Sequence, residues 1–255
     1  MMDIATLAQR QLADIRGLAA NRTFTPPDDC TVTNAFDIQC SAAMLRQEEG
    51  ETHIGYKVGC TSPSTQRQLG ITHPVFGHLF EGEQHSTGVA LSASSFAGLG
   101  IEGELAVRLR APIEPGASVD AIVDALDGVF AVIELHHMDF LAPRSAAALI
   151  CANAIHAGVV RSGPPTRIDG SGPSSMTIRI GDQEVSTVEG SEHLDTVLAS
   201  LSWLAGELHS RGARLEPGQT VLCGTVSGLY PVVAPARITV TTDRFGDVVC
   251  DIADR

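Results

Sequence analysis

Three acidic residues stand inside apolar segments that have the pattern of buried β-strands. Glu102 and Glu104 lie two residues apart in the segment 99–109, and Glu134 lies in the apolar run 130–135. Alternate residues of a strand point to the same face, so Glu102 and Glu104 are expected to lie together. Two like charges in a core are costly without a positive partner. A hard divalent cation is the simplest such partner, because Mg²⁺, Mn²⁺ and Ca²⁺ bind carboxylate oxygens.

The alternation in this segment separates an apolar face from a face that carries the acids. The apolar face holds Ile101, Leu105, Val107 and Leu109, and the other face holds Glu102, Glu104, Ala106 and Arg108. An exposed edge strand with solvated acids has the same spacing. The third acid, Glu134, lies in a second apolar strand and favours the metal site over that alternative.

The rest of the chain indicates a β-rich protein with few helices. We expect strands at 54–59, 101–109, 129–136, 155–161, 175–181, 184–188, 219–223 and 237–251, the last divided in two near 243–246. Helices are expected at 3–20, 34–48, about 118–127 and about 192–210. The strands do not alternate regularly with helices, which argues against a doubly wound sheet. We therefore predict an α+β chain with a small N-terminal helical cap, 1–50, and a β-rich catalytic domain, 51–255.

Composition excludes several classes of partner. The formal net charge of −13 leaves no basic stripe for nucleic acid and disfavours an anionic membrane surface. No apolar run approaches the roughly 20 residues that span a bilayer, and the N-terminus does not resemble a signal peptide. The six cysteines form no Cys-x-x-Cys pair, and several lie in apolar runs. Reduced thiols and a cytoplasmic location are the expectation.

A glycine-rich segment overlaps the acids but does not predict a dinucleotide site. Gly98, Gly100 and Gly103 match G-x-G-x-x-G, which must open a helix to bind a dinucleotide. Here the segment runs into a strand-like alternation. We expect Gly103 to provide space beside the acids, where a ligand can approach closely.

Two further groups stand in apolar surroundings. Lys57, the only lysine of the chain, precedes a turn of small residues at 59–62. Near a metal-bound substrate it can donate a proton or hold a carboxylate, and burial would lower its pKa; the alternative is a surface lysine with a buried stem. His136 and His137 follow Glu134. Adjacent strand residues point to opposite faces, so at most one of the two can join Glu134, and their spacing gives little support for a zinc site.

In order, these segments resemble the 2-hydroxypentadienoate (2-keto-4-pentenoate) hydratase / 4-oxalocrotonate decarboxylase family of the fumarylacetoacetate hydrolase superfamily. The resemblance rests on Gly-Tyr-Lys-Val-Gly-Cys-Thr-Ser at 55–62 and Ile-Glu-Gly-Glu-Leu-Ala at 101–106. The matching stretches are 35–39, 55–62, 68–80, 101–106, 133–134, 152–154, 202–205 and 218–225. They extend over nearly the whole chain.

The resemblance implies a fold, a cofactor and a substrate class. The fold would be a fumarylacetoacetate hydrolase-like roll of mixed β-sheet with peripheral helices. Mg²⁺ or Mn²⁺ would be bound by Glu102, Glu104 and Glu134, with Lys57 as the catalytic lysine. The residues expected to contact the substrate are Thr61, Ser62, Phe76 and Thr225. Substrates would be small 2-hydroxydienoates or 2-oxo acids from the meta-cleavage of aromatic or steroid rings, and the protein would form a homo-oligomer.

The chain departs from the family pattern at three places. Val75 stands where an acid is common, and His137 stands where an aspartate is usual. The stretch 145–152 lacks the lysine and acids that are common before the Asn-Ala pair. The chain thus retains the metal ligands that the resemblance implies, while it lacks several of the family's proton-handling groups.

Four functions remain open from the sequence. Hydration of a 2-hydroxydienoate is the leading hypothesis, and decarboxylation of a 4-oxalocrotonate-type 2-oxo diacid would use the same chelated enolate. An acylpyruvate hydrolase would need a catalytic histidine, for which His53 is the nearest candidate. A divergent member that only binds or supports a partner enzyme is the fourth.

Overall fold

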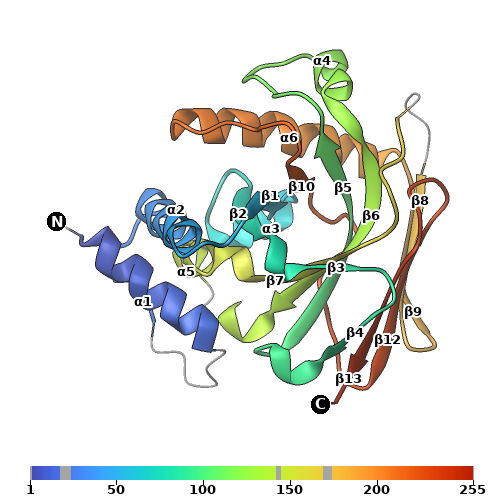
Figure 1. The fold of residues 1–255 in the computed structure, drawn as a ribbon, viewed down its shortest axis with the longest axis horizontal. Helices are drawn as coiled ribbons and strands as arrows, with labels where there is room; N and C mark the ends of the chain where they lie inside the picture. The colour runs from blue at the N-terminus through green and yellow to red at the C-terminus, as the bar shows by residue number, and fades with distance from the viewer. Residues whose placement is uncertain (1, 18–23, 142–144, 169–173, 255) are drawn as a thin grey trace.

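A computed structural model describes residues 2–17, 24–141, 145–168 and 174–254 of the chain (Figure 1). Two β-sheets form its centre. The larger sheet has the strand order β2 (Val75–Phe80), β1 (His53–Gly59), β10 (Thr220–Leu222), β5 (Leu99–Leu109), β6 (Leu126–His137), β7 (His156–Arg161) and β3 (Gln84–Ser86), with β11 (Tyr230–Pro231) paired to β5. The smaller sheet has the order β4 (Val89–Ser92), β13 (Val248–Ala253), β12 (Ala236–Thr242), β8 (Ser174–Ile180) and β9 (Gln183–Gly190). Both sheets contain parallel and antiparallel pairs, so the expected mixed β-sheet is confirmed.

Helices lie around the two sheets. They are α1 (Ile4–Gly17), α2 (Val32–Glu48), α3 (Pro63–Leu69), α4 (Val119–Asp124), α5 (Ala146–Cys151) and α6 (Glu192–Ser210). Figure 1 shows α1, α2 and α5 together beside one end of the larger sheet, with the smaller sheet on the opposite side. No helix in the described ranges combines the length and the apolar character needed to cross a membrane.

Helix α2 joins the N-terminal helices to the larger sheet. It begins at a capping box in which Thr31 and Asn34 bond each other's backbone N–H groups. The Phe36 ring stacks on Phe76 of β2 with centroids 4.7 Å apart, and the Gln39 amide donates to the carbonyls of Phe76 and Ile150. One hydrophobic core contains residues of α1, α2 and both sheets. The boundary at residue 50 between an N-terminal cap and a β-rich domain stays a prediction.

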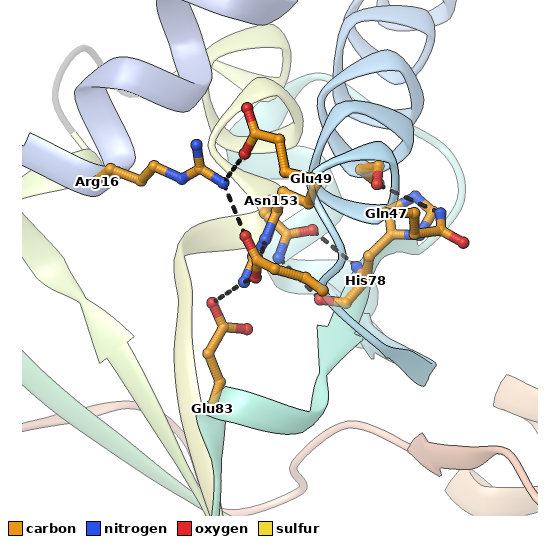
Figure 2. Close-up of polar contacts among 9 residues, drawn as sticks. Arg16, Gln47, Glu49, His78, Glu83 and Asn153 are labelled. Carbon is orange, nitrogen blue, oxygen red and sulfur yellow. Dashed lines mark hydrogen bonds and ion pairs between the residues drawn. The ribbon is translucent and has the colours of Figure 1, made fainter.

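An ionic network closes the N-terminal layer over the sheet (Figure 2). Arg16 of α1 pairs with Glu49 and, at 2.8 Å, with Glu51. Arg46 of α2 contacts Glu51 and reaches Glu83, 2.7 Å away in the turn that follows β2. The four pairs share residues, so they act together in positioning α1 and α2, although partial exposure keeps each pair weak.

Gly103 allows the two sheets to pack closely. A Cβ at this position would lie 2.7 Å from Ile178 Cδ1 of β8 and 3.2 Å from Val240 Cγ2 of β12. Its missing side chain therefore faces the smaller sheet and not the acids. The expectation that Gly103 gives a ligand space beside Glu102 and Glu104 is wrong, because i and i+1 of a strand face opposite sides.

A histidine pair, in which His78 is buried and His53 is half-buried, makes the stability of the fold sensitive to acid. His78 Nδ1 lies 3.2 Å from His53 Nε2, and burial, followed by the positive charges of His53 and Arg46, lowers the pKa of His78 to about 3. The unfolded chain therefore binds a proton at His78 that the folded chain excludes, so stability falls as the pH drops below about 6.5.

At pH 5 His78 alone should cost about 2 kcal/mol relative to pH 7.5. Urea unfolding at both pH values measures this cost. Between pH 7.5 and pH 5, the free energy of unfolding of His78→Phe should fall by about this amount less than that of the wild type. His209→Gln, at an exposed position near the end of α6, serves as the control and should keep the wild-type loss. An equal loss in wild type and His78→Phe would contradict the prediction.

Candidate active site

The three acids come together because β5 and β6 pair in a register that aligns them. Glu102 lies directly opposite Glu134, and Glu104 lies opposite Val132. All three side chains therefore share one face of the larger sheet. Alternation predicted this for Glu102 and Glu104, and the register adds Glu134. The Glu134 side chain is fully buried, Glu104 is buried, and the Glu102 side chain keeps 16% of its surface exposed. Glu102 thus lies at the accessible side of the group.

The larger sheet curls around this face. A small apolar cluster on the same side joins residues of strands that are far apart in the sheet: Leu79, Ala106, Phe130, Val132, Val159 and Leu222. Leu79 comes from β2 and Val159 from β7, so the concave side is filled by its own side chains. The acids therefore occupy a low-dielectric interior in which charges interact strongly.

Lys57 enters the same interior from β1. It lies opposite Gly77 of β2 and Leu222 of β10, and its side chain keeps 3% of its surface exposed. Its Nζ is 3.3 Å from Glu134 Oε1 and donates to the carbonyl of Ala154 at 3.4 Å. The interpretation of Lys57 as a surface lysine is therefore wrong.

The charges in this interior are strongly coupled. Burial by itself lowers the pKa of Lys57, but Glu134, Glu102 and Glu104 outweigh it and raise that pKa above its usual value. The expected lowering is thus reversed, and Lys57 is a stable cation. Burial opposes ionisation of Glu134 as well, but Lys57, His136 and His156 lower the pKa of that carboxyl. The pKa of Glu104 shifts in the opposite direction. Burial and then the charges of Glu134 and Glu102 raise it well above the usual value.

A strained turn supplies part of the lining. Asn153, Ala154 and Ile155 have φ values of 54°, 50° and 58°, the left-handed region that non-glycine residues seldom adopt. The Asn153 amide holds this turn against β2, because it accepts from the His78 N–H and donates to the His78 carbonyl (Figure 2). The turn directs the Ala154 carbonyl to Lys57 and leads into His156. His156 Nδ1 lies 2.7 Å from Glu134 Oε1.

The sequence interpretation did not identify His156 or the Ala154 carbonyl. Both depend on the pairing of β6 with β7, in which His156 lies opposite His136 and Val159 opposite Glu134. The Asn-Ala pair at 153–154 was noted as part of the resemblance, and that pair was the signal available in the sequence.

The expected substrate-contacting residues have different surroundings. Ser62 caps α3 through the Thr65 N–H, and the Thr225 hydroxyl donates to the Gly103 carbonyl. Thr61 lies close to the acids through Gly224: a Cβ on Gly224 would be 2.6 Å from Thr61 Cγ2, and the Gly224 N–H donates to Glu104 Oε2. Both the Ser62 and the Thr225 hydroxyls therefore have structural partners.

Phe76 is not brought together with Lys57. Lys57 lies opposite Gly77, so Phe76 points to the other face of β2 and packs on Phe36. His53 lies near Tyr56, His78 and Phe80 and is likewise not part of the acidic group. This position gives no support to a catalytic role of His53 in an acylpyruvate hydrolase.

Two departures from the family pattern have clear structural places. Val75 lies opposite Gly59 on the face that carries Lys57, and a Cβ on Gly59 would be 3.1 Å from Lys57 Nζ and 3.8 Å from Val75 Cγ2. Val75 therefore adds an apolar wall near Lys57. His137 points away from the acids, and its Nδ1 accepts from the Ala97 N–H.

The donor atoms fit a divalent cation. Glu104 Oε1, Glu134 Oε2 and both ring nitrogens of His136 are buried without a hydrogen-bond partner. Glu102, Glu134 and His136 each offer a ligand atom within 4.8 Å of one another, and Glu104 lies outside this group of three. The repulsion that raises the pKa of Glu104 would be relieved by a cation among the carboxylates.

Curated relatives match nearly the whole chain. A 2-keto-4-pentenoate hydratase from Burkholderia vietnamiensis (strain G4 / LMG 22486) is 27% identical over 260 residues, 96% of this chain and 95% of the relative. A 2-oxo-hept-4-ene-1,7-dioate hydratase from Escherichia coli is 27% identical over 95% of this chain and 93% of the relative. A 4-oxalocrotonate decarboxylase from Pseudomonas putida is 24% identical over 86% and 85%. No protein-family model matches the chain.

Solved structures share the fold. The 4-oxalocrotonate decarboxylase from Pseudomonas putida G7, complexed with magnesium and adipate, superposes with a TM-score of 0.88 at 22% identity over 98% of this chain and 97% of that one. A fumarylpyruvate hydrolase from Pseudomonas aeruginosa, in complex with Mn²⁺ and pyruvate, gives a TM-score of 0.62 at 15% identity over 79% and 90%. The curled mixed sheet with peripheral helices is therefore a known architecture, as expected.

Proposed function

We propose that this chain, whose relatives are named 2-keto-4-pentenoate hydratase and 4-oxalocrotonate decarboxylase, is a divalent-metal-dependent hydratase of that family, within the fumarylacetoacetate hydrolase superfamily. Such an enzyme is a carbon–oxygen lyase. The substrate class is a small 2-hydroxydienoate or 2-oxo-enoic acid of the kind that aromatic ring cleavage produces.

The observation that carries the proposal is the convergence of buried acids with one lysine. Glu102, Glu104 and Glu134 share a face, and Lys57 Nζ lies 3.3 Å from Glu134 Oε1. These acids would hold Mg²⁺ or Mn²⁺. When bound, the ion supplies Lewis-acid stabilisation of the negative charge that develops on the 2-oxygen of the substrate.

The residues of the chain supply the remaining functions. Lys57 is held as a cation by the acids, so it acts as a proton donor or as a partner for the substrate carboxylate. His156 and Lys57 both contact Glu134 Oε1 and fix the orientation of that carboxylate. Val75, beside Lys57, and Leu79, farther along β2, are buried apolar residues that exclude bulk water and favour a dienoate chain over a polar one. Thr61, beside Gly224, offers a further polar contact for the substrate, whereas the Thr225 hydroxyl is engaged by the Gly103 carbonyl.

Product analysis tests the reaction. The protein is incubated with Mg²⁺ and 2-hydroxypenta-2,4-dienoate, and in parallel with a 4-oxalocrotonate-type 2-oxo diacid. We expect proton NMR to show a 4-hydroxy-2-oxo acid from the first substrate. In ¹⁸O-water, mass spectrometry should show one ¹⁸O in the new hydroxyl group in addition to the label that the exchangeable 2-oxo group acquires. Conversion of the first substrate only to the tautomeric ketone would contradict hydration.

Decarboxylation is the second candidate, because relatives named 4-oxalocrotonate decarboxylase also match the chain. It would show as release of CO₂ from the diacid without incorporation of solvent oxygen at C4. The same residues would serve both reactions, since the cation that they would hold would stabilise negative charge on the 2-oxygen of the substrate in each case.

Assembly and location are part of the proposal. We expect a homo-oligomer in the cytoplasm, with neither nucleic acid nor membrane as a partner. The six cysteines are free, which fits a reducing compartment. Light scattering of the purified protein measures its molar mass in solution. A monomer at micromolar concentration would contradict the proposed homo-oligomer.

A further inference from the structure

His136 has surroundings that its role as a strand residue does not explain. It lies two residues after Glu134 on β6 and shares that residue's face. Its Nε2 is 3.2 Å from Glu102 Oε2 and 3.7 Å from Glu134 Oε2, and its side chain keeps 2% of its surface exposed. Neither ring nitrogen has a hydrogen-bond partner. Buried polar groups without partners are rare, and one that faces two carboxylates suggests a shared ligand.

The partners of Glu134 explain which of its atoms face His136. His156 and Lys57 contact Oε1 at 2.7 Å and 3.3 Å. Oε2 has no hydrogen-bond partner and is the oxygen nearest His136. The carboxylate is therefore oriented with one oxygen held by the protein and the other directed to His136 and Glu102.

Unlike His136, the neighbouring histidines His137 and His156 each use one ring nitrogen in a hydrogen bond. His137 uses Nδ1 to accept from the Ala97 N–H, and His156 uses Nδ1 for Glu134. Glu104 Oε2 accepts from the Gly224 N–H, and only its Oε1 is without a hydrogen-bond partner. In the described part of the chain, the ligand atoms that converge within 4.8 Å are those of Glu102, Glu134 and His136.

We propose that His136 Nε2 is a ligand of the divalent cation beside Glu102 and Glu134, and that this nitrogen shifts the metal preference from Mg²⁺ toward first-row transition ions such as Mn²⁺. Mg²⁺ binds oxygen ligands and keeps a strict octahedral shell. An imidazole nitrogen binds divalent first-row transition ions more tightly than it binds Mg²⁺. The inference rests on the metal site of the proposed function but not on the reaction.

Pulsed electron paramagnetic resonance of the Mn²⁺-loaded protein tests the ligand directly. Wild type should show the ¹⁴N coupling of a coordinated imidazole, and labelling all histidines with ¹⁵N should replace it with a ¹⁵N coupling. His136→Leu should lose the coupling, while the matched variant His85→Leu, on the separate strand β3, should keep it.

Calorimetric titration of the metal-free proteins measures the preference. His136→Leu should lower the ratio of Mn²⁺ to Mg²⁺ affinity by about tenfold, whereas His85→Leu should leave it unchanged. A wild-type protein without histidine coupling would overturn the proposal even if His136→Leu does not fold. An unchanged coupling or ratio in folded His136→Leu would do the same.

Neither readout needs turnover. A protein that shows the coupling but does not hydrate any dienoate keeps the ligand assignment and loses the proposed reaction. A hydratase whose metal preference is the same in wild type and His136→Leu keeps the reaction and loses the assignment.

Discussion

Glu134→Gln is expected to abolish tight Mn²⁺ binding and metal-dependent activity together. The substitution keeps the size of the side chain but removes the charge from which the site is built. Glu134 lies between Glu102, Lys57, His136 and His156. We expect Mn²⁺ affinity to fall by at least about 100-fold, beyond the roughly 10- to 100-fold effect of residues that only support a ligand.

The same substitution should also lower stability in the absence of metal. It leaves Lys57 as a buried cation without its nearest acid, and breaking a buried pair in this way costs about 3–5 kcal/mol. Calorimetric titration with Mn²⁺ and urea unfolding measure the two effects. Glu189→Gln, at an exposed position on β9, is the matched control and should change neither. Wild-type Mn²⁺ affinity in Glu134→Gln would refute the assignment of Glu134 as a ligand.

Lys57→Met should separate catalysis from metal binding. Methionine matches the length of the lysine stem but lacks the ammonium group that lies 3.3 Å from Glu134 and donates to Ala154. A positioned proton donor contributes about 10²- to 10⁴-fold to a rate, so kcat should fall by that amount. Mn²⁺ affinity should stay equal or rise, because the substitution removes a positive charge that competes with the ion for Glu134.

Lys57→Arg provides the comparison for this variant. Arginine keeps the charge but has a larger, planar head in a fully enclosed position, so it should restore stability better than activity. Steady-state kinetics at saturating Mn²⁺, together with thermal unfolding, distinguish these outcomes. A Lys57→Met enzyme with kcat within about threefold of wild type would show that Lys57 is a structural counter-ion only.

The face of the acids could be predicted because a strand alternates strictly. Once 101–109 is read as a strand, Glu102 and Glu104 must share a side and Ile101 and Leu105 the other, and β5 has this arrangement. The placement of Glu134 opposite Glu102 depends on the register of β5 and β6. The hydrophobic pattern excludes a one-residue slip of that register, but a slip of two residues keeps every side chain on its face, so alternation alone does not place Glu134 opposite Glu102.

Two elements near the site were not predicted, for local reasons. Strand β2 is buried on both faces, so it has no alternation, and it contains Gly77 and His78, which weaken a strand pattern. Helix α5 is six residues long and too short for a helical period to appear. The interior that holds the acids and Lys57 needs both, because β2 carries Val75 and α5 leads into the turn at Asn153.

The pKa of Lys57 was predicted from the sequence to be lowered, but the structure raises it. Burial was expected to lower that pKa, and burial does act in that direction. The acids that reverse it come from β5 and β6, which are separated from β1 by β10 in the sheet and meet Lys57 only because the sheet curls. A charge balance of this kind depends on tertiary structure and cannot be read from one segment.

Removal and return of the metal test the central claim most directly. The protein is stripped with a chelator, and the ultraviolet absorbance of 2-hydroxypenta-2,4-dienoate is followed before and after addition of Mn²⁺ or Mg²⁺, with Glu134→Gln in parallel. We expect decay of the dienol above background only in the metal-loaded wild type, with the loss of signal matched by the hydrated product. Equal decay in the stripped protein, or no decay above background with either ion and with longer dienoates, would contradict a metal-dependent hydratase.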